Sequence, residues 1–174
     1  MFEHVPEGLG RPIKIELFTF SDASGRVIGT CVYMKLTFQQ EGGVKRYAAL
    51  GIARSRTKRS TASIPTAEAL SILDATTLAE MVRRVFNVER KDCYFYNDSK
   101  AAIGKIRKAK RGGILSVKAH LAPCISKILS KIEDVVHNLR YIPTELNGCA
   151  DVITRGCTVP VSYTHLTLPT ILLV

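Results

Sequence analysis

Runs of β-forming residues dominate the first third of the chain. They cover residues 15–20, 27–37 and 44–53, and short polar turns at 22–26 and 39–43 separate them. The second turn contains a Gly-Gly pair, which favours a tight hairpin. Consecutive strands joined by such short turns must run antiparallel. The pattern therefore predicts a three-stranded antiparallel meander.

Helical spacing of apolar residues alternates with two further strand-like runs in the rest of the chain. Ser63 and Pro65 open the first helical stretch, as a polar cap and a proline near the first helical position. The predicted core face of that helix comprises Ala67, Leu70, Leu73, Leu78, Met81, Val82 and Val85. Predicted helices cover 64–85, 100–108, 117–132 and 150–156, and predicted strands cover 92–97 and 137–142.

This order of elements predicts an α/β fold. Three antiparallel strands come first and two more are added through helical crossovers, which gives a five-stranded mixed sheet with helices on both faces. The 174 residues suit a single domain with its own core. We assign 1–12 to a lead-in segment and 13–157 to the domain. We assign 158–174 to a non-native tail, because it resembles translated sequencing-library adapters.

The chain is strongly basic, with a formal net charge of +10 and a pI of about 9.6. Such a surplus favours a polyanionic partner, most often nucleic acid. A membrane partner is not expected, because neither a basic amphipathic helix nor an apolar run of about 18 residues is present. The five cysteines show no CxxC spacing. They are interpreted as reduced, in an intracellular protein, rather than as disulfides or a zinc site.

Four acidic residues lie at the ends of predicted elements. Asp22 and Asp98 end the first and fourth strands. Glu68 lies in the first turn of a helix, and Asp151 opens the last helix. Each position alone is common for a structural acid, in a turn or at a helix start. If the first and fourth strands are neighbours at the sheet centre, however, all four can converge.

Convergent carboxylates repel one another unless cations lie between them. Ligand sets made only of oxygen favour hard ions, here two Mg²⁺ (or Mn²⁺). Two such ions about 3.5–4 Å apart stabilise the attacking and leaving oxygens of a phosphoryl displacement. The basic tracts at 54–59 and 105–111 would hold a polyanionic substrate beside them; the alternative is that each tract is a solvated loop.

Five short motifs support a family resemblance. They are Phe18–Ser24, Arg54–Arg56, Ser63–Leu70, Tyr94–Lys100 and Tyr141–Gly156. Each motif is weak alone, but the ordered set resembles the ribonuclease H-like domain that follows the reverse transcriptase in BEL/Pao-type retrotransposon polyproteins. The resemblance implies a metal-dependent endonuclease that hydrolyses the RNA strand of RNA–DNA hybrids during reverse transcription. It also implies reverse transcriptase and integrase segments in the same polyprotein, and a cytoplasmic location in retroelement particles.

The resemblance assigns the metal-binding and catalytic positions to Asp22, Glu68, Asp98 and Asp151. Asp22 and Asp98 would anchor both ions, Glu68 would hold one ion on the ribose side, and Asp151 would hold the other. The residues expected to contact nucleic acid are Ser24, Arg54, Arg56, Lys58, Arg59, Ser99, Lys100, Lys105, Arg107, Lys108 and Asn147.

One departure concerns the loop before Asp151. Many ribonucleases H carry a histidine there, whereas residues 143–148 contain none. His120 and His137 are interpreted as structural or surface residues, so Glu145 is the remaining candidate for proton transfer. This departure leaves open a domain that only binds nucleic acid and braces a polymerase.

An integrase or transposase core is a second alternative, with Glu133 as its third acid. The order of elements argues against it, because Glu133 precedes the last strand rather than following it.

Overall fold

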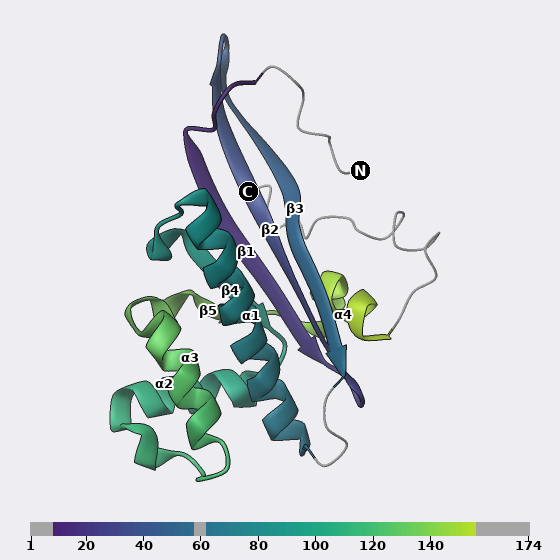
Figure 1. The fold of residues 1–174 in the computed structure, drawn as a ribbon, viewed down its shortest axis with the longest axis vertical. Helices are drawn as coiled ribbons and strands as arrows, with labels where there is room; N and C mark the ends of the chain where they lie inside the picture. The colour runs from purple at the N-terminus through teal and green to yellow at the C-terminus, as the bar shows by residue number, and fades with distance from the viewer. Residues whose placement is uncertain (1–8, 58–61, 156–174) are drawn as a thin grey trace.

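The computed structural model describes residues 9–57 and 62–155, which form one mixed sheet with helices on both faces (Figure 1). The strand order is β3-β2-β1-β4-β5. β1 pairs antiparallel with β2 and parallel with β4, so β1 and β4 are neighbours at the centre. This confirms the predicted α/β class and sheet topology. The strands are β1 (Lys14–Ala23), β2 (Val27–Gln40), β3 (Gly43–Thr57), β4 (Cys93–Asn97) and β5 (Leu139–Tyr141).

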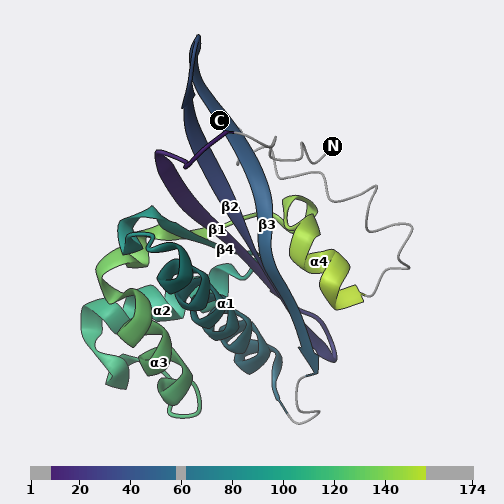
Figure 2. The ribbon, with the colours of Figure 1, turned by 45° about the horizontal axis from the view of Figure 1, so that its top comes forward.

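The helices divide unequally between the two faces of the sheet. Figure 2 shows α1, α2 and α3 on one side and α4 alone on the other. Short 3₁₀ turns at 90–92, 114–116, 133–138 and 144–146 connect the elements. None of the helices within 9–57 and 62–155 is both long enough and apolar enough to cross a bilayer. The helices are α1 (Ile64–Phe86), α2 (Lys100–Gly112), α3 (Ala122–Ile132) and α4 (Gly148–Arg155).

Two hydrophobic clusters cover the two faces of the sheet. Leu17 belongs to the larger cluster under α1, α2 and α3, whereas Phe18 and Phe20 belong to the smaller one under α4. This alternation follows from the two-residue period of a strand. In β4, Phe95 and Tyr96 divide in the same way. The same period places Asp22 and Asp98, two positions after Phe20 and Tyr96, at the α4 face.

β3 extends beyond its predicted end, so Arg54 and Arg56 lie in a strand rather than in a loop. This stretch continues the pairing with β2, and an acid on α1 faces both arginines. Asp74 is 6% exposed, and its Oδ1 lies 3.2 Å from Arg56 Nε and 3.8 Å from Arg54. Thr30 Oγ1 donates to its other oxygen at 3.3 Å. Because residues two apart share a face of a strand, both arginines reach the same carboxylate and keep the strand in register.

The helices also depart from their predicted limits. α2 continues to Gly112, so the basic tract at 105–111 is helical rather than an exit loop. α3 begins at Ala122 instead of 117, with Pro123 in its first turn. On α1, Met81 and Val85 are 54% and 77% exposed, contrary to the predicted core face. The buried face of α1 instead includes Ile72, Ala75 and Ala79.

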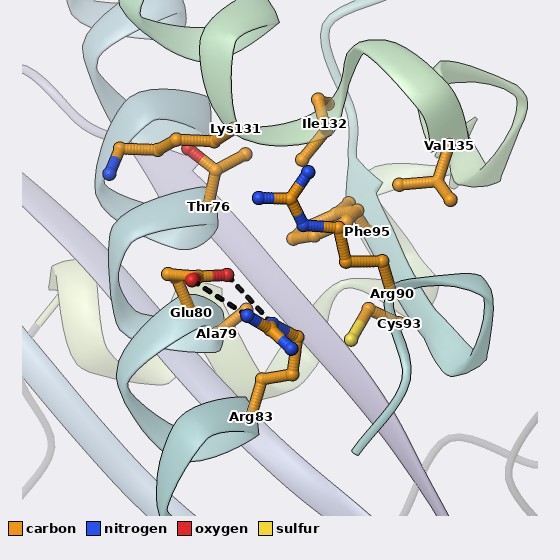
Figure 3. Close-up of a pocket in the computed structure, with 10 residues that line it drawn as sticks. All are labelled: Thr76, Ala79, Glu80, Arg83, Arg90, Cys93, Phe95, Lys131, Ile132 and Val135. Carbon is orange, nitrogen blue, oxygen red and sulfur yellow. Dashed lines mark hydrogen bonds and ion pairs between the residues drawn. The ribbon is translucent and has the colours of Figure 1, made fainter. Parts of the chain in front are cut away.

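A narrow cavity lies between α1, β4 and α3 (Figure 3). Its volume of about 10 Å³ has room for about one water molecule. Glu80 lines it and accepts two bonds from Arg83, at 2.8 and 2.9 Å, and one from Arg84 at 2.8 Å. Glu80 lies about 18 Å along α1 from Glu68. We therefore assign this cavity to packing and not to ligand binding.

The arginine bonds to Glu80 predict a pH-dependent stability. They lower the pKa of Glu80 to about 2, below the value of about 4.3 expected in an unfolded chain. The stabilisation is therefore complete above the unfolded pKa and is lost as the pH falls toward 2. Glu80→Gln should lower the free energy of unfolding by about 1 kcal/mol at pH 7. The effect is no larger because Arg84 is exposed and solvent screens its charge.

Urea unfolding of both proteins between pH 7 and pH 3 measures this difference, which should shrink as the pH falls. The exposed carboxylate of Glu133 supplies the control, because Glu133→Gln should leave the pH dependence unchanged. A constant difference between wild type and Glu80→Gln across this pH range would contradict the assignment.

Candidate active site

Asp22 and Asp98 lie side by side at the ends of the two central strands. The last registered pair of the parallel β1–β4 ladder is Ser21 with Asn97, and each acid is the next residue along. Neighbouring strands lie about 4.8 Å apart. Both acids are partly exposed. The sheet register thus delivers two carboxylates to one edge, as the sequence predicts.

Asn97 holds the two strand ends together beneath the acids. It is 1% exposed, and its Nδ2 lies 2.9 Å from Ser21 O and 3.1 Å from Ser71 Oγ on α1. Its Oδ1 accepts from the backbone N–H of Ser99 at 2.9 Å. One buried amide therefore fixes β1, α1 and the chain around Asp98. The sequence reasoning did not single out Asn97, although its place directly before Asp98 was a signal.

Two of the predicted acids, Asp22 and Glu68, act electrostatically on a third, Asp98. Burial raises the pKa of Asp98, the hydroxyl of Thr144 opposes that shift, and the carboxylates of Asp22 and Glu68 raise it further. Glu68 reaches this edge because α1 begins there, at Ile64 (Figure 1). It lies just beyond the first turn of α1, not within it as expected.

Asp151 lies on α4, which packs against β1 and β2. The start of α4 is tied to β1 by Asn147, whose Nδ2 donates to Ser21 O at 3.0 Å. The backbone carbonyl of Asn147 also accepts from the N–H of Asp151 at 3.1 Å. The structure therefore gathers Asp22, Glu68 and Asp98 at the strand ends and places Asp151 on the adjoining helix.

The donor set fits a hard divalent cation in its chemistry. It consists of carboxylate oxygens, the ligands that Mg²⁺ and Mn²⁺ prefer. Within residues 9–57 and 62–155, no group of three or more His, Cys, Asp or Glu side chains is arranged to bind one metal ion. Mg²⁺ does not require such a group, because it is usually bound by one or two carboxylates together with water and substrate phosphates. The adjacent pair Asp22 and Asp98 meets that requirement.

A match to a known protein family covers more than half of the chain. Residues 9–99 match the family described as the Pao retrotransposon-like RNaseH-like domain. The chain belongs to this family. The matched stretch of the Pao-type domain includes Asp22, Glu68 and Asp98, and ends before Asp151. A search of curated protein sequences finds no match.

Solved structures similar to the Pao-type domain include ribonucleases H1. LC11-RNase H1, isolated from compost by a metagenomic approach, is 21% identical with a TM-score of 0.47, covering 80% of this chain and 91% of that one. The same protein in complex with an RNA/DNA hybrid gives 18% and 0.45, covering 86% and 99%. The ribonuclease H1 of Halobacterium salinarum NRC-1 gives 12% and 0.40, covering 80% and 92%.

Several residues expected to contact nucleic acid instead have partners within the Pao-type domain. Asn147 is 1% exposed and Ser99 is 8% exposed, so neither presents a surface to a ligand. Ser99 caps α2 by accepting from the N–H of Ala102 at 3.1 Å. Arg54 and Arg56 pair with Asp74, as described above.

Of the three further residues expected to contact nucleic acid, the structure describes Ser24. Ser24 Oγ lies 3.3 Å from Val27 O and 3.4 Å from Thr154 O, within a turn against α4. Lys58 and Arg59 lie outside the described residues, as do residues 1–8 of the lead-in and the tail at 158–174.

The basic residues of α2 lie on the surface. Lys100 is exposed and stacks over the ring of Tyr141, 4.4 Å from its centroid. Arg107 is exposed and donates to Leu139 O at 2.8 Å. Lys108 is exposed, whereas Lys105 is half-buried. Further along α2, an open cleft of about 450 Å³ is lined by Arg107, Lys110, Arg111, Val136 and His137. α2 thus presents a run of exposed positive charge.

The remaining candidates divide between the two ends of the sheet. Glu133 and His137 lie in the turn before β5. Because β5 runs parallel to β4, that turn lies at the end of the sheet opposite Asp98. Glu145 is exposed in the turn that holds Thr144, whose hydroxyl donates to Asp98 Oδ2 at 3.0 Å. Of these three residues, Glu145 alone lies near the acids.

Proposed function

We propose that this domain is a divalent-metal-dependent endonuclease that hydrolyses the RNA strand of RNA–DNA hybrids during reverse transcription of a BEL/Pao-type retrotransposon. The observation that carries the proposal is the placement of Asp22 beside Asp98, with Glu68 close enough to raise the pKa of Asp98. Acids that destabilise one another in this way are suited to a site that a cation neutralises.

In this proposal the residues of the domain bind and orient the substrate. Two Mg²⁺ or Mn²⁺ ions, when bound, would supply charge stabilisation for the attacking and leaving oxygens. Asp22 and Asp98 would hold both ions, Glu68 would hold one on the ribose side, and Asp151 would hold the other and orient water. Selection of RNA over DNA would rest on the 2′-hydroxyl.

The basic surface of α2 would hold phosphates without reading sequence, so binding to the hybrid should weaken as salt increases. Reverse transcriptase and integrase segments of the same polyprotein would be the protein partners. The site of action would be the cytoplasm, within retroelement particles.

A nucleic-acid-binding domain that braces a reverse transcriptase is the second candidate. It is favoured by one observation, the absence of a histidine in the turn and helix start at 143–148, where Glu145 is the exposed acid nearest Thr144. In that case the acids would lie together at the strand ends without supporting turnover.

Incubation of the purified domain with an end-labelled RNA–DNA hybrid distinguishes the two candidates. With Mg²⁺ or Mn²⁺, we expect nicks in the RNA strand, no cleavage of the matching DNA duplex, and loss of all cleavage in EDTA. A domain that binds the hybrid but cuts it with neither ion would overturn the nuclease and support the brace.

A further inference from the structure

The hydroxyl of Thr154 lies between two acceptors at the edge of the acid cluster. Thr154 Oγ1 is 2.6 Å from Asp22 Oδ2 and 3.0 Å from the backbone carbonyl of Asp151. Thr154 is 6% exposed, so solvent competes little for these contacts. A hydroxyl has a single proton and can donate to only one of them at a time.

The carboxylate is the stronger of the two acceptors. A charged acceptor forms shorter and stronger hydrogen bonds than a peptide carbonyl, and the 2.6 Å separation to Asp22 is in the range of charge-assisted O–H bonds. The contact with Asp151 O is the ordinary bond of a threonine back to its own helix. Thr154 therefore donates to Asp22, and this bond fixes one of its two carboxylate oxygens.

The other oxygen of Asp22 remains available. Among the described residues, Thr154 makes the only hydrogen bond to the Asp22 side chain. Asp98 is arranged similarly, since Thr144 donates to its Oδ2 at 3.0 Å. The two contacts differ in environment, because Thr144 is exposed whereas Thr154 is buried. Water can replace the hydroxyl of Thr144 but not that of Thr154.

Packing fixes the position of the Thr154 hydroxyl. α4 crosses β2 at Gly29, where an added Cβ would lie 2.8 Å from Thr154 Cγ2. Gly29 is also the cross-strand partner of Asp22. The turn residue Ser24 adds a contact to the carbonyl of Thr154 at 3.4 Å. Thr154 is thus held by the same segment of sheet that presents Asp22.

We propose that Thr154 is a positioning residue: it orients the Asp22 carboxylate so that its free oxygen meets the cation, and it couples α4, with Asp151, to that acid. This proposal rests on the proposed function, since it concerns the same acids. Hydrogen-bond partners of metal ligands typically change metal affinity by about 10- to 100-fold when removed. Loss of the Thr154 hydroxyl should therefore weaken cation binding while the domain keeps its fold.

The test compares Thr154→Ala with Thr154→Ser, which differ by one hydroxyl. Mn²⁺ binding to each variant is measured by the electron paramagnetic resonance signal of free Mn²⁺, without substrate. Thr154→Ala should bind Mn²⁺ about 10-fold more weakly than wild type, and Thr154→Ser should stay within about twofold. Thr144→Ala, which removes an exposed hydroxyl, should also stay within about twofold. Far-UV circular dichroism checks the fold, and Thr154→Val replaces Thr154→Ala if the latter does not fold.

Equal Mn²⁺ affinity in Thr154→Ala and Thr154→Ser would overturn the proposal, whether both match wild type or both are weakened, because the hydroxyl would then have no part. If wild type binds Mn²⁺ and cuts the hybrid in either of those cases, the proposed function stands alone. If wild type binds no Mn²⁺ in the absence of substrate, the role of Thr154 in cation binding is overturned, and the cleavage assay alone decides the proposed function.

Discussion

Replacing Asp98 with asparagine should reduce cleavage of the RNA strand by about 1,000-fold or more, which corresponds to about 4 kcal/mol of transition-state stabilisation. Asparagine keeps the shape of the side chain and can still accept from Thr144, but it removes the charge that would hold a cation beside Asp22. Binding of the hybrid should change little, because the exposed basic residues of α2 are untouched. Single-turnover cleavage and fluorescence-anisotropy binding, both at fixed salt, measure the two effects separately.

The same substitution should not destabilise the metal-free domain. The pKa of Asp98 is raised by burial and by Asp22 and Glu68, so its charged form is disfavoured in the folded state. This cost is present at neutral pH and disappears as the pH falls below the pKa of the unfolded chain. Asp98→Asn should therefore unfold at the same temperature as wild type or higher at pH 7 without metal, and the two should converge in acid.

Asp134 supplies a matched control for Asp98. It is an exposed carboxylate in the turn before β5, with a long ion pair to Arg90 at 3.6 Å. Asp134→Asn should cut the hybrid at the wild-type rate, within about twofold, because surface pairs of this kind contribute little. Cleavage by Asp98→Asn above a tenth of the wild-type rate would show that Asp98 does not hold a cation needed for the reaction.

The sheet and the adjacency of Asp22 and Asp98 could be predicted because they follow from local rules. Short turns fix the antiparallel meander, and helical crossovers add the parallel strands. The placement of both acids follows from the strand ends, since Ser21 and Asn97 are in register. Apolar spacing and connection lengths predict the elements and their directions, and the pairing of β1 with β4 is the further condition that brings the two acids together.

The residues that sequence reasoning misplaced depend on partners far away in the chain. Arg54 and Arg56 continue the pairing of β3 with β2 and face Asp74 of α1, a contact that no local pattern predicts. Asn147 resembles a loop residue but is buried to tie α4 to β1. Thr154 lies within the motif at 141–156, yet its contact with Asp22 depends on how α4 crosses the sheet. Tertiary packing decides each case, and sequence spacing does not encode it.

Gly29→Ala should lower cleavage of the hybrid by about 100-fold while most of the domain stays folded. A Cβ at Gly29 would lie 2.8 Å from Thr154 Cγ2 and 2.9 Å from the backbone oxygen of Ala150. Because one of these atoms belongs to the backbone of α4, a side-chain rotation cannot relieve the clash, and the helix must shift. Such a shift moves Asp151 and withdraws the hydroxyl of Thr154 from Asp22. Sequence reasoning passed over Gly29, although a glycine inside a β-forming run is a signal of close approach.

The hairpin that contains Gly29 supplies the control for this substitution. Gly25 lies in the turn between β1 and β2, and an added Cβ there meets no atom within 4 Å. Gly25→Ala should therefore cut the hybrid like wild type. The larger part of the core lies on the opposite face, under α1, α2 and α3, so Gly29→Ala should lose activity out of proportion to its stability. Cleavage rates and thermal unfolding of both variants measure that disproportion. If Gly29→Ala cuts as fast as Gly25→Ala, close docking of α4 on β2 is not needed for the reaction, and the roles of Asp151 and Thr154 fail with it.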